Sequence, residues 1–131
     1  MPTGAIVCID DEKLVLDSLK VQLREGFGNE FLLEFAQDAQ EGFEVIDELF
    51  KDGVNVLTVV CDWLMPGMKG DEFLIEIHKR HPKIIKIMLT GQIDHKAIER
   101  AKNEANLFSC LNKPWDKQEL LDTIRLGLQK L

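Results

Sequence analysis

Short apolar runs alternate along the chain with longer stretches in which apolar residues recur every three or four positions. A short apolar run is typical of a strand buried on both faces, and the longer spacing is typical of an amphipathic helix. The short runs predict strands at 4–10, 31–37, 55–62, 84–91 and 107–112. The longer stretches predict helices at 12–28, 39–52, 71–81, 94–104 and 116–131. Strands and helices therefore alternate from one end of the chain to the other.

This alternation predicts right-handed βαβ crossovers and a doubly wound α/β fold, in which helices cover both faces of a five-stranded parallel sheet. The glycines at positions 26 and 28 are expected to end the first helix, and Asp116 to cap the last one. The chain has 131 residues, is 45% hydrophobic and contains no linker-like stretch. Residues 1–131 are therefore expected to form a single domain with its own core.

Composition narrows the function classes. The chain has a net charge of -7 and so lacks the excess of basic residues that a nucleic-acid-binding surface carries. We therefore expect no nucleic acid partner for this domain. No apolar stretch approaches the length of a membrane span, and the first residues lack the pattern of a signal peptide. Three cysteines without CxxC spacing suit reduced thiols. Together these features predict a cytoplasmic protein without membrane contact.

The residues at the ends of the predicted strands carry carboxylate, hydroxyl and ammonium groups, which can take part in chemistry. The first strand ends in Asp10 and Asp11, the third in Asp62, the fourth in Thr90, and Lys113 follows the fifth. In open parallel sheets, chemistry collects in the crevice beyond the carboxyl ends of the strands. We therefore expect three carboxylates, one hydroxyl and one ammonium group to converge at one edge.

Three neighbouring carboxylates repel one another unless a cation lies among them. Oxygen ligands suit Mg²⁺, whose sites typically include a phosphate oxygen, and a lysine and a threonine nearby would contact such an anion. A carboxylate can also act as a nucleophile and form an aspartyl phosphate, and Asp62 is the natural candidate. Taken singly, Asp62 is an ordinary cap and Asp10–Asp11 an ordinary helix start. Their convergence favours the chemical interpretation.

Four motifs carry a family resemblance: CIDDE at 8–12, VVCDWLMPGMKG at 59–70, IMLTG at 87–91 and LNKPW at 111–115. In this order and at this spacing they resemble the receiver domain of two-component response regulators, and the resemblance covers nearly the whole chain. It implies a flavodoxin-like (βα)5 fold with strand order 2-1-3-4-5. It also implies a phosphoacceptor signalling domain that switches conformation to control an output domain or effector protein.

The resemblance further implies roles for individual residues. Asp62 matches the aspartate that takes a phosphoryl group from a histidine kinase or histidine phosphotransfer protein. Asp11 and Asp62 match direct Mg²⁺ ligands, Asp10 matches the acid that holds the metal through water, and the backbone carbonyl of Leu64 matches the third protein ligand. Mn²⁺ is an alternative ion.

Three further matches concern the phosphoryl group and the switch. Lys113 matches the lysine that bridges the acids and then the phosphoryl oxygens, and Thr90 matches the hydroxyl that moves toward the phosphoryl group. Pro114 matches a proline that usually forms a cis bond with that lysine. A homodimer through the fourth helix, fifth strand and fifth helix is a further possibility within the family.

The chain departs from the family pattern in two places. Cys110 occupies the position of a Tyr or Phe whose ring usually rotates on activation, and a thiol has too little volume for that role. Phe108 would point to the same face as Cys110 if the strand is regular. Leu64 and Gln92 occupy positions beside the path of attacking water. Because a leucine shields that path, the sequence predicts slow autodephosphorylation.

Other function classes stay open at this stage. A degenerate receiver that acts only as a protein-interaction module is the main alternative, and Cys110 is the feature that favours it. A haloacid-dehalogenase-like phosphatase would need a second acid two residues after its nucleophile, where this chain has Leu64. A flavodoxin-like FMN protein would need a Ser/Thr/Gly phosphate loop after the first strand, where this chain has DDEKL.

Overall fold

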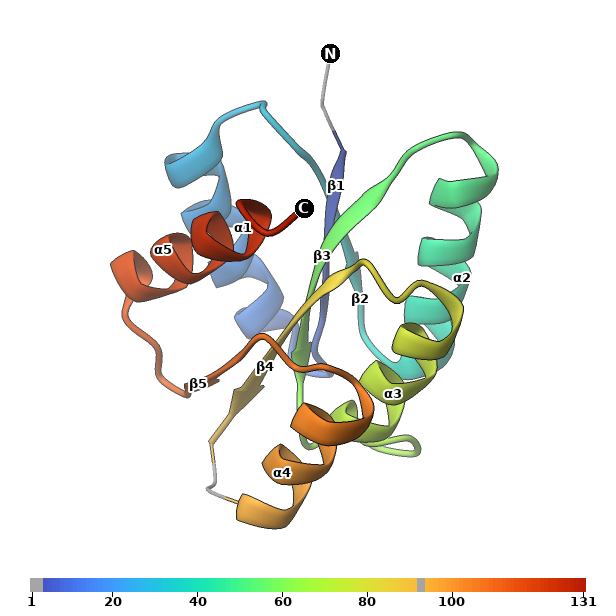
Figure 1. The fold of residues 1–131 in the computed structure, drawn as a ribbon. Helices are drawn as coiled ribbons and strands as arrows, with labels where there is room; N and C mark the ends of the chain where they lie inside the picture. Colours follow the sequence, from blue (N-terminus) through green and yellow to red (C-terminus); the bar gives the residue numbers. More distant parts are fainter. Residues whose placement is uncertain (1–3, 92–93) are drawn as a thin grey trace.

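The computed structural model describes residues 4–91 and 94–131 of the chain (Figure 1). Its strands form one parallel sheet in the order β2-β1-β3-β4-β5, which confirms the predicted topology. The strands are β1 (Ala5–Ile9), β2 (Leu32–Ala36), β3 (Val56–Asp62), β4 (Ile85–Thr90) and β5 (Ser109–Asn112). β3 therefore lies at the centre of the sheet, between β1 and β4.

Helices cover both faces of this sheet. They are α1 (Lys13–Phe27), α2 (Ala39–Lys51), α3 (Gly70–Arg80), α4 (His95–Glu104) and α5 (Lys117–Leu128). Figure 1 shows α1 and α5 together on one face and α2, α3 and α4 on the other. This is the doubly wound α/β arrangement expected from the alternation of apolar patterns.

The core consists of two apolar layers, one on each side of the sheet. Along β3, Val59 and Cys61 belong to the layer under α2, α3 and α4, whereas Val60 belongs to the layer under α1 and α5. All three side chains are fully buried, as expected for a central strand of a parallel sheet.

Within the described residues, no helix combines the length and the apolar character that a membrane crossing requires.

The ends of the helices show which sequence signals hold. Gly28 ends α1 with a φ of 58°, and its N–H donates to the carbonyl of Arg24 at 2.9 Å. Asp116 caps α5 as predicted, because its carboxylate accepts from the N–H of Glu119 at 3.0 Å. The expectation for Gly26 was wrong, since this residue lies inside α1. A β-carbon there would come within 2.5 Å of Leu121, so Gly26 lets α5 pack closely on α1.

Candidate functional site

The carboxyl edge of the sheet brings the predicted site residues together. Asp10 directly follows β1, Asp62 is the last residue of β3, Thr90 is the last residue of β4, and Lys113 directly follows β5. Backbone hydrogen bonds extend beyond the strands here, since the N–H of Lys113 donates to the carbonyl of Thr90 at 2.8 Å. Asp10, Asp62 and Thr90 are all buried. The strand ends thus hold these side chains on rigid backbone.

Lys113 joins the two buried carboxylates. Its Nζ lies 2.7 Å from Asp10 Oδ2 and 2.9 Å from Asp62 Oδ1. The other oxygen of Asp10 accepts from the N–H of Glu12 at 2.8 Å, just before α1 begins. Asp10 therefore has two roles: one oxygen holds the turn that leads into α1, and the other belongs to the site.

The charges of the site are perturbed by its burial. Burial raises the pKa of Asp62 to about 6; the hydrogen bond from Lys113 opposes this shift, and the Asp10 carboxylate adds to it. Burial lowers the pKa of Lys113, but its hydrogen bonds to Asp10 and Asp62 outweigh that effect and raise the pKa above its ordinary value. One lysine thus faces more negative charge than it can neutralise.

The donor set fits a hard divalent cation. Asp10, Asp11 and Asp62 each offer a carboxylate oxygen, and these oxygens all lie within 4.8 Å of one another. Asp11 is exposed whereas the other two acids are buried, so water reaches one side of the cluster. Oxygen ligands together with access to water are what Mg²⁺ requires. The residues present therefore fit the metal that the sequence predicts.

The loop after β3 is held close to the start of α3. The N–H of Gly70 donates to the carbonyl of Trp63 at 2.7 Å. A β-carbon at position 70 would collide with the carbonyl oxygen of Asp62, so only glycine permits this approach. Within the loop, Met65 is buried, whereas the side chain of Leu64 is 52% exposed beside the end of β3.

The fifth strand requires one correction. β5 begins at Ser109, so Phe108 lies before the strand and does not follow its alternation. Phe108 packs in the layer under α1 and α5, with ring atoms 3.4 Å from where a β-carbon of Gly127 would lie. Cys110 is half-buried and packs in the opposite layer, under α2, α3 and α4. The expectation that Phe108 and Cys110 share a face is therefore wrong.

Two other sequence predictions concern the neighbouring loops. The Lys113–Pro114 peptide bond is cis, as the family resemblance implies. Gln92 lies outside the described residues. Beside Pro114, the indole N–H of Trp115 donates to Gln22 Oε1 of α1 at 2.7 Å, a contact that sequence reasoning did not anticipate.

Sequence reasoning also missed two buried charged residues. Asp71 lies in the first turn of α3 and is 5% exposed, although an acid at that place in the sequence is typical of an exposed partner of the helix dipole. Lys86 lies in β4 and is 1% exposed. In IIKIMLTG it is the single charged residue of an apolar run, and that is the signal that could have identified it.

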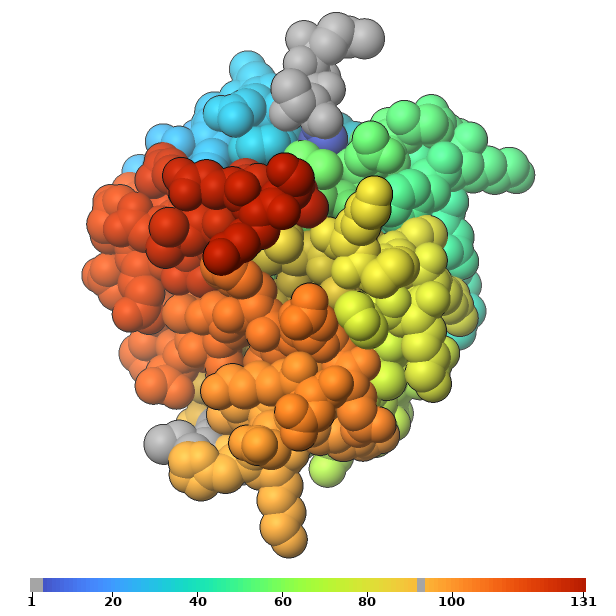
Figure 2. Space-filling view, in the orientation of Figure 1, coloured from blue at the N-terminus to red at the C-terminus, as the bar shows by residue number. Residues whose placement is uncertain are grey.

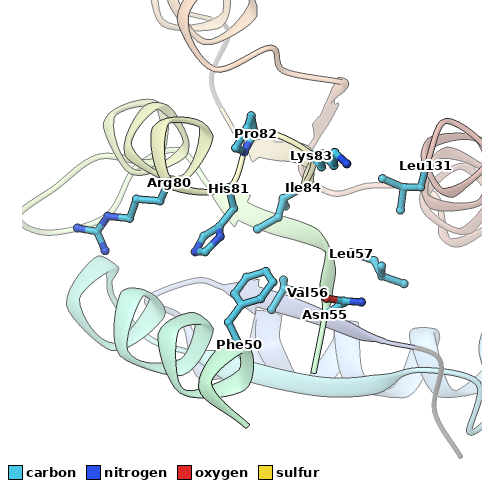
Figure 3. Close-up of a pocket in the computed structure, with 10 residues that line it drawn as sticks. All are labelled: Phe50, Asn55, Val56, Leu57, Arg80, His81, Pro82, Lys83, Ile84 and Leu131. Atoms are coloured by element: carbon cyan, nitrogen blue, oxygen red, sulfur yellow. The ribbon is translucent and has the colours of Figure 1, made fainter. Parts of the chain in front are cut away.

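A cavity of about 500 Å³ lies at the opposite, amino end of the sheet (Figure 3). Phe50 and His81 form one wall, with ring centroids 4.1 Å apart, and Leu57 and Leu131 also line the cavity. None of the acidic residues of the carboxyl edge lines it. The cavity is therefore separate from the candidate site.

Comparisons with known proteins agree with this geometry. A family model described as the response regulator receiver domain matches residues 6–125. The hydrogenase transcriptional regulatory protein HoxA of Cupriavidus necator is 33% identical over 96% of this chain, which spans 24% of that protein. The sensor kinase CckA of Brucella abortus is 33% identical over 98% of this chain, which spans 13% of it. The chain thus corresponds to a small part of these longer relatives.

Solved structures share both the fold and its extent. The signal receiver domain of an HD domain-containing protein from Pseudomonas fluorescens has a TM-score of 0.85 and 32% identity, with 97% of this chain and 95% of that chain covered. A CheY-like receiver domain protein from Methanospirillum hungatei has a TM-score of 0.84 and 28% identity, with 97% and 94% covered. The chain belongs to the response regulator receiver domain family of two-component signalling proteins.

Proposed function

We propose that this receiver domain accepts a phosphoryl group on Asp62 from a histidine kinase or a histidine phosphotransfer protein, in a reaction that depends on Mg²⁺. The observation that carries the proposal is the position of the Asp62 carboxylate. It ends the central strand, lies 2.9 Å from the ammonium group of Lys113, and shares a 4.8 Å cluster with two further acids.

The metal would be held by the chain's own oxygens. Asp11 and Asp62 would bind Mg²⁺ directly, Asp10 through water, and the backbone carbonyl of Leu64 would complete the protein ligands. Mn²⁺ prefers similar ligands and is the alternative ion. When bound, the ion would neutralise charge on the phosphoryl oxygens.

The transfer itself asks for positioning more than for acid–base chemistry. An Asp62 oxygen attacks the phosphorus atom of a phosphohistidine, the new O–P bond forms as the P–N bond breaks, and the imidazole leaves with the electron pair of that bond. Lys113 stabilises the charge on the transferred oxygens, and the hydroxyl of Thr90 donates a hydrogen bond to one of them. The attacking carboxylate must be ionised, so with a pKa of about 6 Asp62 is mostly ready at neutral pH.

The switch would follow from the added charge. A phosphoryl group brings roughly -1.5 to -2 units of charge near pH 7. Drawing the Thr90 hydroxyl toward that charge moves the end of β4, and this movement would change the outer surface near α4. The changed surface would act on an output domain or an effector protein, and a homodimer through α4, β5 and α5 is one form that this action could take.

The names of the relatives support these partner classes. One relative is a transcriptional regulatory protein and another is a sensor kinase, so receivers similar to this one occur beside outputs and beside kinases.

The cysteines Cys8, Cys61 and Cys110 are free thiols. We therefore place the domain in a reducing cytoplasm, where such kinases deliver their phosphoryl groups.

Mass measurement tests the proposal directly. The protein is incubated with Mg²⁺ and acetyl phosphate, a small phosphodonor, and an adduct of about 80 Da is expected, as for one aspartyl phosphate. The adduct should disappear in Asp62→Asn and persist in Asp17→Asn, which changes an exposed acid of α1. An adduct that persists in Asp62→Asn would overturn the assignment.

A degenerate receiver is the second candidate, and Cys110 is the observation that favours it. Burial raises the pKa of this half-buried thiol, so the side chain is a small neutral group where the family usually has a ring. If no donor gives an adduct and beryllofluoride does not bind, the domain acts as a protein-interaction module only.

The lifetime of the phosphoryl group tests the role of Leu64. Its exposed side chain lies beside the end of β3, where it would shield the path of attacking water. We expect slow loss of phosphate in the wild type and a severalfold faster loss in Leu64→Asn. Leu126→Asn changes an equally exposed leucine of α5 and should leave the rate unchanged. A wild-type half-life of seconds would contradict the proposed shielding.

A further inference from the structure

The carboxylate of Asp71 is buried at unusual energetic cost. This residue of the first turn of α3 is 5% exposed, and its Oδ1 has no hydrogen-bond partner among the described residues. Its other oxygen lies 3.6 Å from Nη1 of Arg100, which belongs to α4. A buried acceptor without a partner is destabilising, whereas an exposed acid would interact with the helix dipole equally well. The burial of Asp71 therefore calls for another explanation.

The helix that carries Arg100 is attached to the body of the protein by small side chains. The buried residues of α4 are Ala97 and Ala101. Figure 2 shows α4 lying against α3 on the surface of the molecule. In the part of the chain that the structure describes, Arg100–Asp71 is the only ion pair that joins α4 to another element. Arg100 is also held by Glu104 at 3.0 Å, which restricts where its guanidinium can lie.

Asp71 is also close to the candidate site. The preceding residue, Gly70, donates its N–H to the carbonyl of Trp63, which directly follows Asp62. A β-carbon on Gly70 would collide with the carbonyl oxygen of Asp62, so Asp71 follows a residue that lies directly against the backbone of Asp62. Because Asp62 and Asp71 are both buried, charge at one position acts on the other more strongly than it would in water.

We propose that Asp71 and Arg100 form a positioning pair that holds α4 against α3, and that this pair tightens when the charge at Asp62 becomes more negative. A phosphoryl group on Asp62 would add negative charge near the Asp71 carboxylate. The added charge would attract the guanidinium of Arg100 more strongly toward Asp71. Arg100 supplies that cation from the surface of α4. The second half of the proposal rests on the proposed phosphorylation of Asp62.

The pair offers a route for the signal that does not require an aromatic ring at position 110. It runs from Asp62 through the first turn of α3 to Arg100 of α4, and both of these helices pack on the same apolar layer. An ion pair in which only the carboxylate is buried is weak evidence for stability, since apolar replacements of buried ion pairs are often equally stable. Its expected contribution is therefore the placement of α4 and not the stability of the fold.

Hydrogen exchange of the α4 amides tests the pair in the whole 131-residue chain. In the wild type with Mg²⁺, we expect beryllofluoride to slow exchange in α4 by about twofold or more. In Asp71→Asn and in Arg100→Gln, exchange in α4 should already be faster without beryllofluoride, and beryllofluoride should no longer slow it. Arg100→Lys keeps the charge and should restore part of the response.

A matched control is available on the neighbouring side of α3. Arg80 and Asp47 form an ion pair between α3 and α2 at the same distance of 3.6 Å, but both side chains are exposed. Arg80→Gln should leave exchange in α4 unchanged in both states. Binding of beryllofluoride, followed by the tryptophan fluorescence of the protein, should stay within about threefold of the wild type in every variant, because none of the changes touches a proposed ligand.

Asp71→Leu guards against a variant that fails to fold. Leucine fills the buried position with apolar atoms, so we expect a folded protein whose α4 no longer responds to beryllofluoride. Exchange in α4 that equals the wild type in both states, in Asp71→Leu and in Arg100→Gln, would overturn the proposal. A wild type that binds no beryllofluoride would overturn the proposed function and the coupling to Asp62. Comparing α4 exchange in the wild type and in the variants without beryllofluoride would still decide whether the pair holds α4.

Discussion

The two ends of the sheet each contain a lysine that is largely removed from water, and the two lysines are in opposite situations. At the carboxyl edge, Lys113 lies between Asp10 and Asp62, and its pKa is raised. Near the amino end, Nζ of Lys86 donates to the carbonyl of Ile84 at 2.8 Å and contacts that of Pro82 at 3.4 Å. Burial lowers the pKa of Lys86 to about 8. Partners of opposite charge, and not burial alone, decide whether a buried ammonium is stabilised.

The contrast shows that the carboxyl edge is suited to bind a ligand, whereas the amino end holds its buried lysine only as part of the fold. The carboxyl edge has more negative charge than Lys113 can balance, so it is disposed to take up a cation. The amino end holds Lys86 with neutral carbonyls, and the burial of His78, followed by the charge of Lys86, lowers the pKa of that imidazole. Among the residues that the structure describes, the groups around Lys86 offer a metal no set of ligands.

The largest expected difference between the two ends appears on removal of Lys113. In Lys113→Met, Asp10 and Asp62 face each other without a cation, and breaking a buried pair in this way costs about 3 kcal/mol. Urea unfolding in metal-free buffer measures the loss, and the mass adduct should vanish. Lys117→Met removes an exposed partner of Glu25 and should change neither quantity. An unchanged unfolding midpoint in Lys113→Met would contradict the role of the lysine.

Mg²⁺ should stabilise the protein through the carboxyl edge alone. At a free concentration tenfold above its Kd, a ligand of the folded state adds about 1.4 kcal/mol to the free energy of unfolding. Asp11→Asn should lose this gain, and Lys86→Met should keep it. Because Asp62 has a pKa of about 6, protons compete with the metal below that pH, and the gain should be smaller at pH 5 than at pH 7.5. An equal gain at both pH values would show that Asp62 is not a ligand.

Lys86 should make the free energy of unfolding rise with pH, whereas a lysine in an ion pair makes it fall. The pKa of Lys86 is about 8 in the folded protein and 10.5 in the unfolded chain, so the unfolded chain binds more protons between these values. The free energy of unfolding therefore rises with pH in this window, by about 1 kcal/mol from pH 8 to 9. This gain should be absent from Lys86→Met. Comparing the two proteins at each pH removes the effects of the cysteines, which both contain.

The smallest effect is expected at the wall of the amino-end cavity. His81→Leu removes the stack on Phe50 shown in Figure 3, which should cost about 0.5 kcal/mol in urea unfolding. The yield and lifetime of the mass adduct should not change. A changed adduct would mean that the two ends of the sheet are coupled, and the separation described above would then be wrong.

The sequence predicts the carboxyl edge well because topology determines it. Once strands and helices alternate, every strand must end at the same edge, and the residues that follow the apolar runs must meet there. Asp10, Asp62 and Lys113 were identified by this reasoning without knowledge of any distance. The topology does not fix which oxygen contacts which neighbour, and the double use of Asp10 became visible only from its two hydrogen bonds.

The errors arise where one residue type serves two physical purposes. A glycine can end a helix or admit a neighbouring helix, and Gly26 does the second. An acid early in a helix can face water or be buried against a cation, and Asp71 does the second. Phe108 was misplaced because the start of β5 differs by two residues from the predicted strand. Each of these outcomes depends on contacts between distant segments, which local patterns do not contain.

The closure of the loop after β3 has a consequence for how this protein can evolve. The hydrogen bond from Gly70 to Trp63 ties the start of α3 to the end of the central strand, and the missing side chain of Gly70 allows that contact. The exposed side chain of Leu64, which lies between them, can therefore change without moving the strand or the helix. On the proposed role of Leu64 as a shield of the phosphoryl group, selection could adjust how long a signal persists as an independent trait, while the apparatus that receives the signal stays the same.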